Sequence, residues 1–348
     1  MQNEVNDAKY MKMIVGTYTD CGSKGVYSYE FDPDSGATVR LGEMQTGNPS
    51  FLTVAPSGEV VYAVNENGEN DSAVTAISLD AKTGAMGLMS SVPDFGWGPC
   101  HILQVGNDVV VSNFGDGSLA VCSIEDDGSL GMWSQFIVYG DRLRKSRIHS
   151  ASISADGRHL LVVDFCADCL YVTKVEKDGN HHCELGDGST IQLKKGCGPR
   201  CGVFNARGTV FYLLTEKSCE IMVMDYDAKR GKLDLRQTVA MAADSFAAAA
   251  DIHLSPDGKW LYASMRRVDD GIYIYKVAGD GSIELAGHQP TGLHPRNFAI
   301  TPCGRWLLVA CRDSNVIEIY RRNAETGMFS HKNDADISLS KPVCIRLF

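Results

Sequence analysis

The stretch Ala250–Arg266 reads ADIHLSPDGKWLYASMR and decides the fold, because it contains two strand-forming runs around a tight turn. The run before Pro256 is apolar at its core, and the run after Gly258 is rich in aromatic and aliphatic residues. Gly258 supplies the positive φ that a short hairpin turn demands. The stretch therefore predicts a β-hairpin.

The same pattern recurs along nearly the whole chain. The other copies read FLTVAPSGEVVYAVNE, CHILQVGNDVVVSNF, HSASISADGRHLLVVDF, RCGVFNARGTVFYLLTE and RNFAITPCGRWLLVACR. Their turn glycines are Gly58, Gly106, Gly157, Gly208, Gly258 and Gly304, which are 46 to 51 residues apart by subtraction. Each copy is followed by further alternating strands, such as GIYIYKV. Four strands in about 45 to 50 residues make one blade of a β-propeller.

The two ends of the chain supply a further blade. Met13–Thr17 and Gly25–Phe31 are strand-like but lack an inner strand, which Pro342–Phe348 (PVCIRLF) can provide. Such closure removes exposed sheet edges. The sequence thus predicts an all-β, seven-bladed β-propeller closed by pairing of the N- and C-terminal strands. We expect a flexible segment over residues 1–10 and a single propeller domain over 11–348.

Composition and charge limit the classes of partner. The chain has 348 residues, is 22% charged and carries a formal net charge of -10, which argues against binding nucleic acid. A local cationic pocket for a small anion remains compatible with this charge. No apolar run approaches the roughly 20 residues of a membrane helix, and the polar start lacks a signal peptide. We expect a cytoplasmic protein without a membrane partner, and the sequence does not indicate its oligomeric state.

Cysteine chemistry is the next possibility to weigh among the 12 cysteines. Cys166 and Cys169, with the run His181–Cys183, could suggest zinc, but they lack the two compact ligand couples of a structural site. Thiols buried or placed in turns are the favoured interpretation. Motifs for a serine nucleophile elbow, a zinc protease or a phosphate-binding loop are also missing. The sequence predicts no metal and no cofactor.

Polar residues recur at equal distances from the turn glycines. Cross-strand neighbours in a hairpin are equally far from its turn, so such residues should meet at one end of each blade. Eight positions before the glycines stand Ser50, His149, Arg200, Ala250 and Arg296, with Cys100 and His101 nearby in the shortened second repeat. Eight positions after them stand Glu66, Phe165, Glu216, Arg266 and Arg312, with Asn113 near the equivalent place. We expect these side chains around one mouth of the central channel.

The residue types in this set favour hydrolysis or isomerisation of a small anion. A histidine can deprotonate water, and arginines can hold an anion or stabilise an oxyanion. The candidate catalytic residues are His149, Arg200, Glu216 and Arg266, and the candidate substrate-binding residues are Arg296, His101, Glu66 and Asn113. The alternative is a ring of salt bridges that only holds the blades together. The basic run Arg142–Arg147 is interpreted as a solvated loop, with a lid over the site as the alternative.

At these residues the chain resembles the 6-phosphogluconolactonase family of the seven-bladed type, which includes 3-carboxy-cis,cis-muconate lactonizing enzymes. The resemblance rests on IVGTYT (14–19), GNPSFLTVAPSG (47–58), YAVNE (62–66), HSASISADG (149–157), GPR (198–200), Glu216, Ala250–Arg266, HPRNFAITPCG (294–304) and PVC (342–344). It implies hydrolysis of 6-phospho-D-glucono-1,5-lactone to 6-phosphogluconate in the oxidative pentose phosphate pathway. It also implies that His149, Arg200, Glu216 and Arg266 correspond to the family's His, two Arg and Glu.

Three departures from the family pattern accompany the resemblance. Cys201 stands where His is usual, one repeat turn reads NARG without Pro-Asp, and the second repeat is shortened to VGND. Two other functions are left open by the residues. One is a muconate-type cycloisomerase, whose arginines would anchor a dicarboxylate or tricarboxylate. The other is a non-catalytic scaffold, since propellers also bind proteins on their flat faces.

Overall fold

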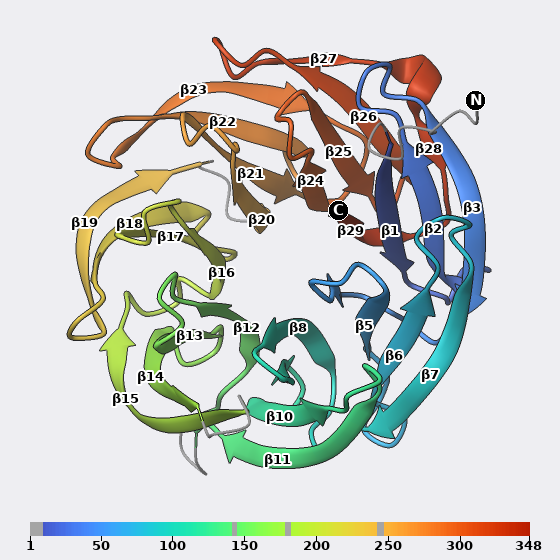
Figure 1. Ribbon diagram of the computed structural model, residues 1–348. Helices are drawn as coiled ribbons and strands as arrows, with labels where there is room; N and C mark the ends of the chain where they lie inside the picture. The colour runs from blue at the N-terminus through green and yellow to red at the C-terminus, as the bar shows by residue number, and fades with distance from the viewer. Residues whose placement is uncertain (1–9, 141–144, 178–181, 242–246) are drawn as a thin grey trace, which may run out of the picture.

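A computed structural model describes residues 10–140, 145–177, 182–241 and 247–348. In this part of the chain, seven sheets stand around a central axis, and the chain visits them in order (Figure 1). The predicted seven-bladed β-propeller is therefore confirmed. The expected flexible segment 1–10, apart from Tyr10, and residues 142–144 of the basic run lie outside the described residues. No helix of the described residues is long and apolar enough to cross a membrane.

Each blade has an inner strand beside the axis and an outer strand at the rim (Figure 1). Blade 1 comprises β29 (Pro342–Leu347), β1 (Met11–Thr17), β2 (Gly25–Phe31) and β3 (Thr38–Gln45), and blade 2 comprises β4 (Leu52–Val54), β5 (Val60–Asn65), β6 (Ala73–Leu79) and β7 (Met86–Pro93). Blade 3 comprises β8 (Pro99–Val105), β9 (Asp108–Asn113), β10 (Ser118–Ile124) and β11 (Leu130–Val138), and blade 4 comprises β12 (Ile148–Ile153), β13 (His159–Asp164), β14 (Cys169–Lys177) and β15 (Cys183–Gln192).

The remaining blades follow the same order. Blade 5 comprises β16 (Pro199–Phe204), β17 (Val210–Thr215), β18 (Glu220–Asp227) and β19 (Lys232–Ala240), and blade 6 comprises β20 (Ala248–Leu254), β21 (Trp260–Arg266), β22 (Gly271–Val277) and β23 (Ile283–Pro290). Blade 7 comprises β24 (Pro295–Ile300), β25 (Trp306–Cys311), β26 (Val316–Arg322) and β27 (Phe329–His331), with β28 (Ile337–Ser338) also paired to β26 and the short 3₁₀ helix η1 (Asn333–Ala335) between them.

The ring closes within blade 1, where the two ends of the chain meet. Strand β1 lies between β2 and the C-terminal strand β29, and Val15 is paired with Ile345 in an antiparallel register. The predicted pairing of the N- and C-terminal strands is therefore present. Because β29 is the innermost strand of this blade, the last strand of the chain also helps to line the channel.

The core consists of layers between neighbouring blades. Strands β5, β9, β13, β17, β21 and β25 are buried at every residue, because each is covered on both faces by adjacent blades. Three buried tyrosines each connect one blade to the next through a hydrogen bond from the hydroxyl to a glycine carbonyl. These bonds are Tyr62 to Gly128 at 2.9 Å, Tyr212 to Gly281 at 2.9 Å and Tyr262 to Gly327 at 3.1 Å. Each such bond contributes about 1 kcal/mol to stability and connects two neighbouring blades.

Candidate active site

The polar residues near the axis are positioned by β-bulges. In six blades the register between the inner strand and its neighbour shifts at the same place, near the start of the inner strand. A bulge leaves one residue without a cross-strand partner and re-aims its side chain. In blades 3, 4, 5 and 7 the extra residues are Cys100, His149, Arg200 and Arg296. The bulges therefore turn these side chains out of the regular alternation and into the channel.

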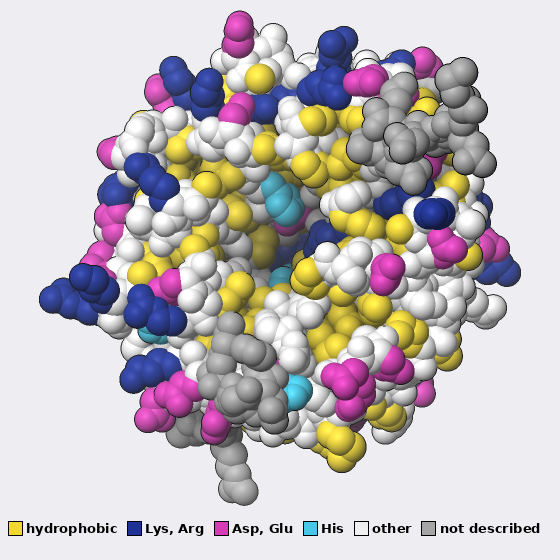
Figure 2. Space-filling model, in the orientation of Figure 1, with side chains coloured by type: hydrophobic (Ala, Val, Ile, Leu, Met, Phe, Trp, Pro, Cys, Tyr) yellow, Lys and Arg dark blue, Asp and Glu magenta, His cyan; other side chains and the backbone are white. Residues whose placement is uncertain are grey.

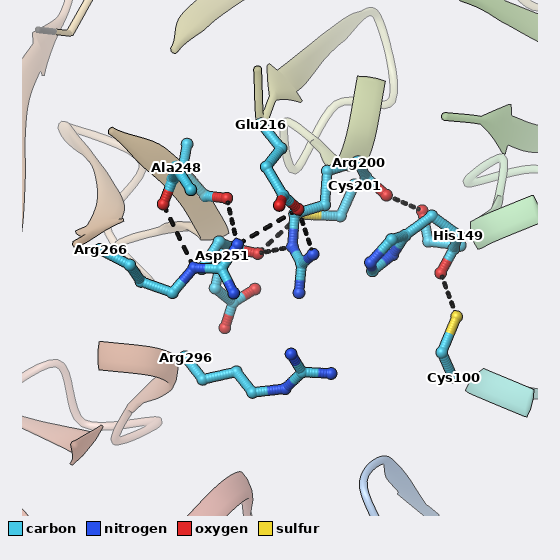
Figure 3. A network of polar contacts seen from close by, with 12 residues as sticks. Cys100, His149, Arg200, Cys201, Glu216, Ala248, Asp251, Arg266 and Arg296 are labelled. Atoms are coloured by element: carbon cyan, nitrogen blue, oxygen red, sulfur yellow. Dashed lines mark hydrogen bonds and ion pairs between the residues drawn. The ribbon is translucent and has the colours of Figure 1, made fainter. Parts of the chain in front are cut away.

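These residues surround a cavity of about 370 Å³ at one mouth of the channel. Of the eight predicted site residues, the structure brings six to this cavity: Glu66, His149, Arg200, Glu216, Arg266 and Arg296. They come from five different blades. Figure 3 shows Arg200, Arg266 and Arg296 directing their guanidinium groups toward the same space as the His149 ring.

Glu216 is the centre of a buried ion-pair cluster in the mouth. Its Oε2 lies 2.5 Å from Arg200 Nη1 and 3.2 Å from Arg266 Nη2, and all three side chains are at most 14% exposed. Burial alone would raise the pKa of Glu216, but the charges of Arg200 and Arg266 outweigh it and hold that pKa at about 2. The carboxylate is therefore ionised at neutral pH and offsets part of the charge of the two arginines.

Backbone carbonyls of blade 6 fix the same two guanidinium groups. Arg200 Nε donates to the Ala250 carbonyl at 2.6 Å, while Arg266 donates to the carbonyls of Ala248 and Ala249 at 3.2 and 3.0 Å. Burial and the charge of Arg200 lower the pKa of Arg266 to about 9, which still leaves it protonated at pH 7. The remaining N–H groups of these arginines are available at fixed positions, as stabilisation of a developing oxyanion requires.

His149 lies beside the arginines, and no carboxylate of the described residues forms an ion pair with its ring. Its ring makes edge contacts with Phe114 and Phe165 at centroid distances of 5.5 and 6.4 Å. Its Nδ1 is buried and makes no hydrogen bond with any residue that the structure describes. Burial, together with the charges of Arg200 and Arg296, lowers the pKa of His149 well below its ordinary value. The imidazole is therefore neutral at pH 7 and can accept a proton.

A second carboxylate–guanidinium pair lies on another side of the mouth. Glu66 Oε2 is 3.6 Å from Arg296 Nη2 and accepts a hydrogen bond from the Tyr18 hydroxyl at 2.8 Å. The Arg296 guanidinium also lies over the Tyr18 ring, 5.3 Å from its centroid. Each of these three residues thus contacts the other two, and the contacts of Tyr18 and Glu66 orient the Arg296 guanidinium.

The structure places the other two predicted residues elsewhere. His101 lines a second cavity of about 290 Å³ further along the channel, where its ring packs on Phe51 at 4.4 Å. Burial lowers the pKa of His101 to about 3, so it adds no charge there at neutral pH. Asn113 is fully buried inside blade 3, where it donates to Ser118 Oγ at 3.0 Å. In blade 3 the bulge residue that reaches the mouth is Cys100.

Residues missed by the sequence reasoning also belong to the mouth. His294 lines it, with Nε2 lying 3.2 Å from Arg266 Nη1, and Tyr18 supports Glu66. Both lie in segments whose sequence resembles the family, but both are outside the hairpins from which the candidates were drawn. The positions of Tyr18 and His294 do not follow the regular spacing from the turn glycines, so that spacing could not reveal them.

Cys201, where the family usually has His, faces the second cavity rather than the mouth. Its thiol points to the Ala250 carbonyl at 3.6 Å, the same oxygen that accepts the Arg200 bond. Burial raises the pKa of the Cys201 thiol, so it stays protonated. The residue that departs from the family pattern thus lies next to Arg200 on the side of the second cavity, and it does not line the mouth.

Of the candidate zinc ligands, His182 and Cys183 are part of the interface between blades 3 and 4. His182 Nδ1 lies 3.0 Å from Asp108 Oδ1, and Cys183 donates its backbone N–H to the other oxygen of Asp108 at 2.6 Å. His181 lies outside the described residues. Within those residues, no group of three or more His, Cys, Asp or Glu side chains is arranged to hold a metal ion.

Comparison with known proteins assigns the chain to a family. Residues 12–347 match the family described as lactonase, 7-bladed beta-propeller, and the chain belongs to this family. A relative from Formosa agariphila named 6-phosphogluconolactonase is 35% identical over 332 residues, or 90% of this chain and 93% of the relative. The chain thus combines a family-wide propeller with a mouth that carries His149, Glu216 and five arginines.

Solved structures agree with this assignment. A structure from Bacteroides fragilis has a TM-score of 0.94 and 36% identity, with 99% of each chain covered. The periplasmic gluconolactonase PpgL of Pseudomonas aeruginosa has a TM-score of 0.90 and 28% identity, and the match covers 97% of this chain and 99% of that one. The name of the Formosa agariphila relative thus refers to a phosphorylated lactone, and the name of the Pseudomonas aeruginosa protein refers to an unphosphorylated one.

Proposed function

We propose that the protein hydrolyses 6-phospho-D-glucono-1,5-lactone to 6-phosphogluconate, without a metal ion. Membership of the lactonase family makes it a lactone hydrolase. The observation that carries the finer proposal is the position of neutral His149 beside the Arg200–Glu216–Arg266 cluster. A general base and a preorganised cationic site are what water attack on a lactone carbonyl requires.

In the proposed reaction, His149 takes a proton from a water molecule as its oxygen attacks the lactone carbonyl carbon. The electron pair of the C=O bond moves to its oxygen, and Arg200 and Arg266 stabilise this oxyanion. When the carbonyl re-forms, the bond to the ring oxygen breaks, and protonated His149 returns the proton to that oxygen. The products are a carboxylate, after loss of its acidic proton to solvent, and a hydroxyl group.

The electrostatics of the mouth affect this role of His149 in two opposite ways, because the lowered pKa makes the imidazole a weaker base. The guanidinium charges that lower its pKa also stabilise the negative charge that develops on the attacked carbonyl oxygen. Proton transfer to the imidazole is thus coupled to the formation of a charge that the same arginines favour. Glu216 keeps Arg200 and Arg266 in place and limits their mutual repulsion.

The test is lactonase activity of the purified protein and of its variants His149→Ala and Arg200→Ala, after subtraction of uncatalysed hydrolysis. We expect kcat to fall by about 100-fold or more in each variant, as for loss of a general base or an oxyanion donor. His331→Ala is the matched control, because His331 pairs with Asp336 in blade 7, outside both channel cavities. Wild-type turnover in both variants would falsify the assigned roles.

Two other outcomes would redirect the assignment. Turnover of a carboxymuconate without turnover of any lactone would indicate a cycloisomerase, and turnover of neither would indicate a non-catalytic scaffold. We also propose a cytoplasmic location, where phosphorylated sugars are retained. The Pseudomonas aeruginosa relative is named as periplasmic, so fractionation of the cells that produce this protein is the direct test.

A further inference from the structure

The mouth carries more positive charge than the Arg200–Glu216–Arg266 cluster alone supplies. Among the residues that line this cavity are Arg200, Arg266, Arg267, Arg296 and Arg312 on the positive side, and Glu66 and Glu216 on the negative side. Five positive and two negative charges leave a surplus of three, since the histidines are neutral. This surplus occurs in a chain whose formal net charge is -10. A local field of this sign favours a multiply charged anion.

Two of the five arginines stand apart from the carboxylates of the mouth. Arg267 makes no ion pair with any carboxylate that the structure describes. Arg312 pairs with Asp313 at 2.8 Å, but Asp313 is shared with Lys341 at 3.1 Å. Among the described residues, the three cations Arg267, Arg312 and Lys341 thus have one carboxylate, Asp313, as their ion-pair partner. We name Arg267 and Arg312 the outer arginines.

Arg267 and His294, whose carbonyl accepts the backbone N–H of Arg312, are held in an unusual backbone conformation. Arg267 and His294 have φ values of 82° and 61°, a region that residues other than glycine seldom adopt. Asp270 Oδ1 accepts the backbone N–H of both residues, at 3.1 and 2.9 Å. Such backbone strain costs about 1–3 kcal/mol per residue and persists where the surroundings enforce it, often at ligand sites. Asp270 thus fixes the loops of blades 6 and 7 together.

His294 separates the outer arginines from the catalytic cluster. Its Nε2 lies 3.2 Å from Arg266 Nη1, and its Nδ1 lies 3.2 Å from Arg312 Nη2 and 3.3 Å from Asp313 Oδ2. Burial and the charges of Arg266 and Arg312 lower the pKa of His294 to about 3. In the tautomer that donates Nδ1–H to Asp313, the neutral ring accepts a hydrogen bond from Arg266 at Nε2 and lies beside Arg312 without adding a third charge.

We propose that the outer arginines, Arg267 and Arg312, bind the phosphate group of a phosphorylated lactone while Arg200 and Arg266 act on its carbonyl. This inference rests on the proposed function and adds a residue-level phosphate subsite. In 6-phospho-D-glucono-1,5-lactone the phosphate is joined to the carbonyl carbon through the ring oxygen, C5, C6 and O6. The substrate can thus place its reactive carbonyl beside Arg200 and Arg266 and its charged phosphate beside the outer arginines, within the same cavity.

Another part of the mouth offers a matched control. Lys217 Nζ lies 4.4 Å from the centroid of the Phe165 ring, and the Arg147 guanidinium lies 5.0 Å from that of Phe114. Both aromatic rings line the mouth. Removal of Lys217 takes away one positive charge at the mouth without touching the outer arginines. It therefore separates a general field effect from binding at one place.

The experiment compares kcat/KM for 6-phosphogluconolactone and for D-glucono-1,5-lactone in wild type, Arg267→Gln, Arg312→Gln, the double variant and Lys217→Gln. Two lost charge-assisted hydrogen bonds should lower kcat/KM for the phosphorylated lactone by about 100-fold in the double variant, mainly through KM. We expect a much smaller change with the unphosphorylated lactone. Inhibition by inorganic phosphate should weaken in parallel, whereas Lys217→Gln should affect both lactones equally and slightly.

The outcomes separate this inference from the proposed function. An equal fall for both lactones in the double variant, or unchanged inhibition by phosphate, would overturn the phosphate subsite. So would a loss of discrimination in Lys217→Gln alone, or a wild type that hydrolyses both lactones equally well. If the wild type hydrolyses neither lactone, the proposed function itself fails. A native near-ultraviolet circular dichroism spectrum for each variant excludes misfolding as the cause.

Discussion

The hydroxyl of Tyr18 donates a 2.8 Å hydrogen bond to Glu66, which connects the loop after β1 of blade 1 to the end of β5 in blade 2. Glu66 in turn faces Arg296 of blade 7. Residues from three blades thus determine where one guanidinium group lies in the mouth. Arg296 touches the cavity, whereas Tyr18 acts through Glu66 as a positioning residue.

Tyr18→Phe should therefore impair activity only through Glu66. We expect kcat/KM to fall by about 3- to 10-fold, the worth of one hydrogen bond to a charged group, with little change in Tm. In a Glu66→Gln background the same substitution should have a much smaller effect, since the charged acceptor is gone. Tyr275→Phe is the control, because the Tyr275 hydroxyl has no partner among the described residues. Full additivity of the two substitutions would rule out this coupling.

Glu216→Gln should cost both stability and activity. The substitution leaves Arg200 and Arg266 buried with little to compensate their charges, and breaking a buried ion pair costs about 3 kcal/mol. Thermal unfolding should show a clear drop in Tm, together with loss of lactonase activity. Glu43→Gln removes a carboxylate from the exposed pair with Arg40 and should change stability by less than about 1 kcal/mol. Equal Tm values for the two variants would contradict the buried cluster.

Stability should fall on mild acidification because of buried neutral histidines. The folded pKa values of His101 and His294, both about 3, lie below the ordinary value near 6.5. The unfolded chain therefore binds more protons below pH 6.5, so this part of the stability is complete above 6.5 and is lost as the pH falls toward 3.

Urea unfolding at pH 7.5 and 5.5 measures this effect. For His101→Gln we expect the loss of stability between the two pH values to be smaller than in wild type by about 1 kcal/mol. Tyr275→Phe, which removes a hydroxyl that stays neutral at both pH values, should keep the wild-type difference. The same pH dependence in His101→Gln and wild type would show that His101 is not the group that titrates.

Alkylation should distinguish Cys303 from the buried thiols. Although partial burial opposes it, hydrogen bonds from Arg305 and Thr301 lower the pKa of Cys303, and this residue is exposed. Cys201 and Cys344 are shielded, and burial raises the pKa of both thiols. Iodoacetamide at pH 7.5 should thus modify Cys303 well before Cys201, as peptide mass spectrometry can follow. Arg305→Gln should slow the Cys303 reaction, and early labelling of Cys201 would argue against its position behind Arg200.

Hairpin turns made the propeller predictable, and the C-terminal strand could be assigned because the first blade lacked an inner strand. The same counting from the turn glycines brought His149, Arg200 and Glu216 together. It could not resolve the shortened repeat, where Cys100 rather than His101 is the bulge residue that reaches the mouth. A shift of one residue in a strand moves a side chain to the other face. Asn113, near the expected place, is accordingly buried inside its blade.

Loops explain most of what the sequence could not predict. His294 lines the mouth and Tyr18 contacts it through Glu66, both from segments outside the repeated hairpins, and the backbone N–H of His294, which has a positive φ, is bonded to Asp270. The roles assigned to His149, Arg200, Glu216 and Arg266 stay predictions, as do the binding roles of Arg296, His101, Glu66 and Asn113. What the structure adds is their relative placement: His149, Arg200 and Arg296 line both cavities, Glu66, Glu216 and Arg266 line the mouth, and His101 lines the second cavity.

The pairing of β1 with β29 also has a consequence for biosynthesis. Strand β1 is translated before the rest of the propeller, yet its inner neighbour β29 is translated after all the other strands of the propeller. Until Pro342–Leu347 emerges, blade 1 lacks its innermost strand, and the edge of β1 that faces the channel is unpaired. A nascent chain can therefore assemble Arg200 with Glu216 well before it can complete the pocket that they share with Arg296.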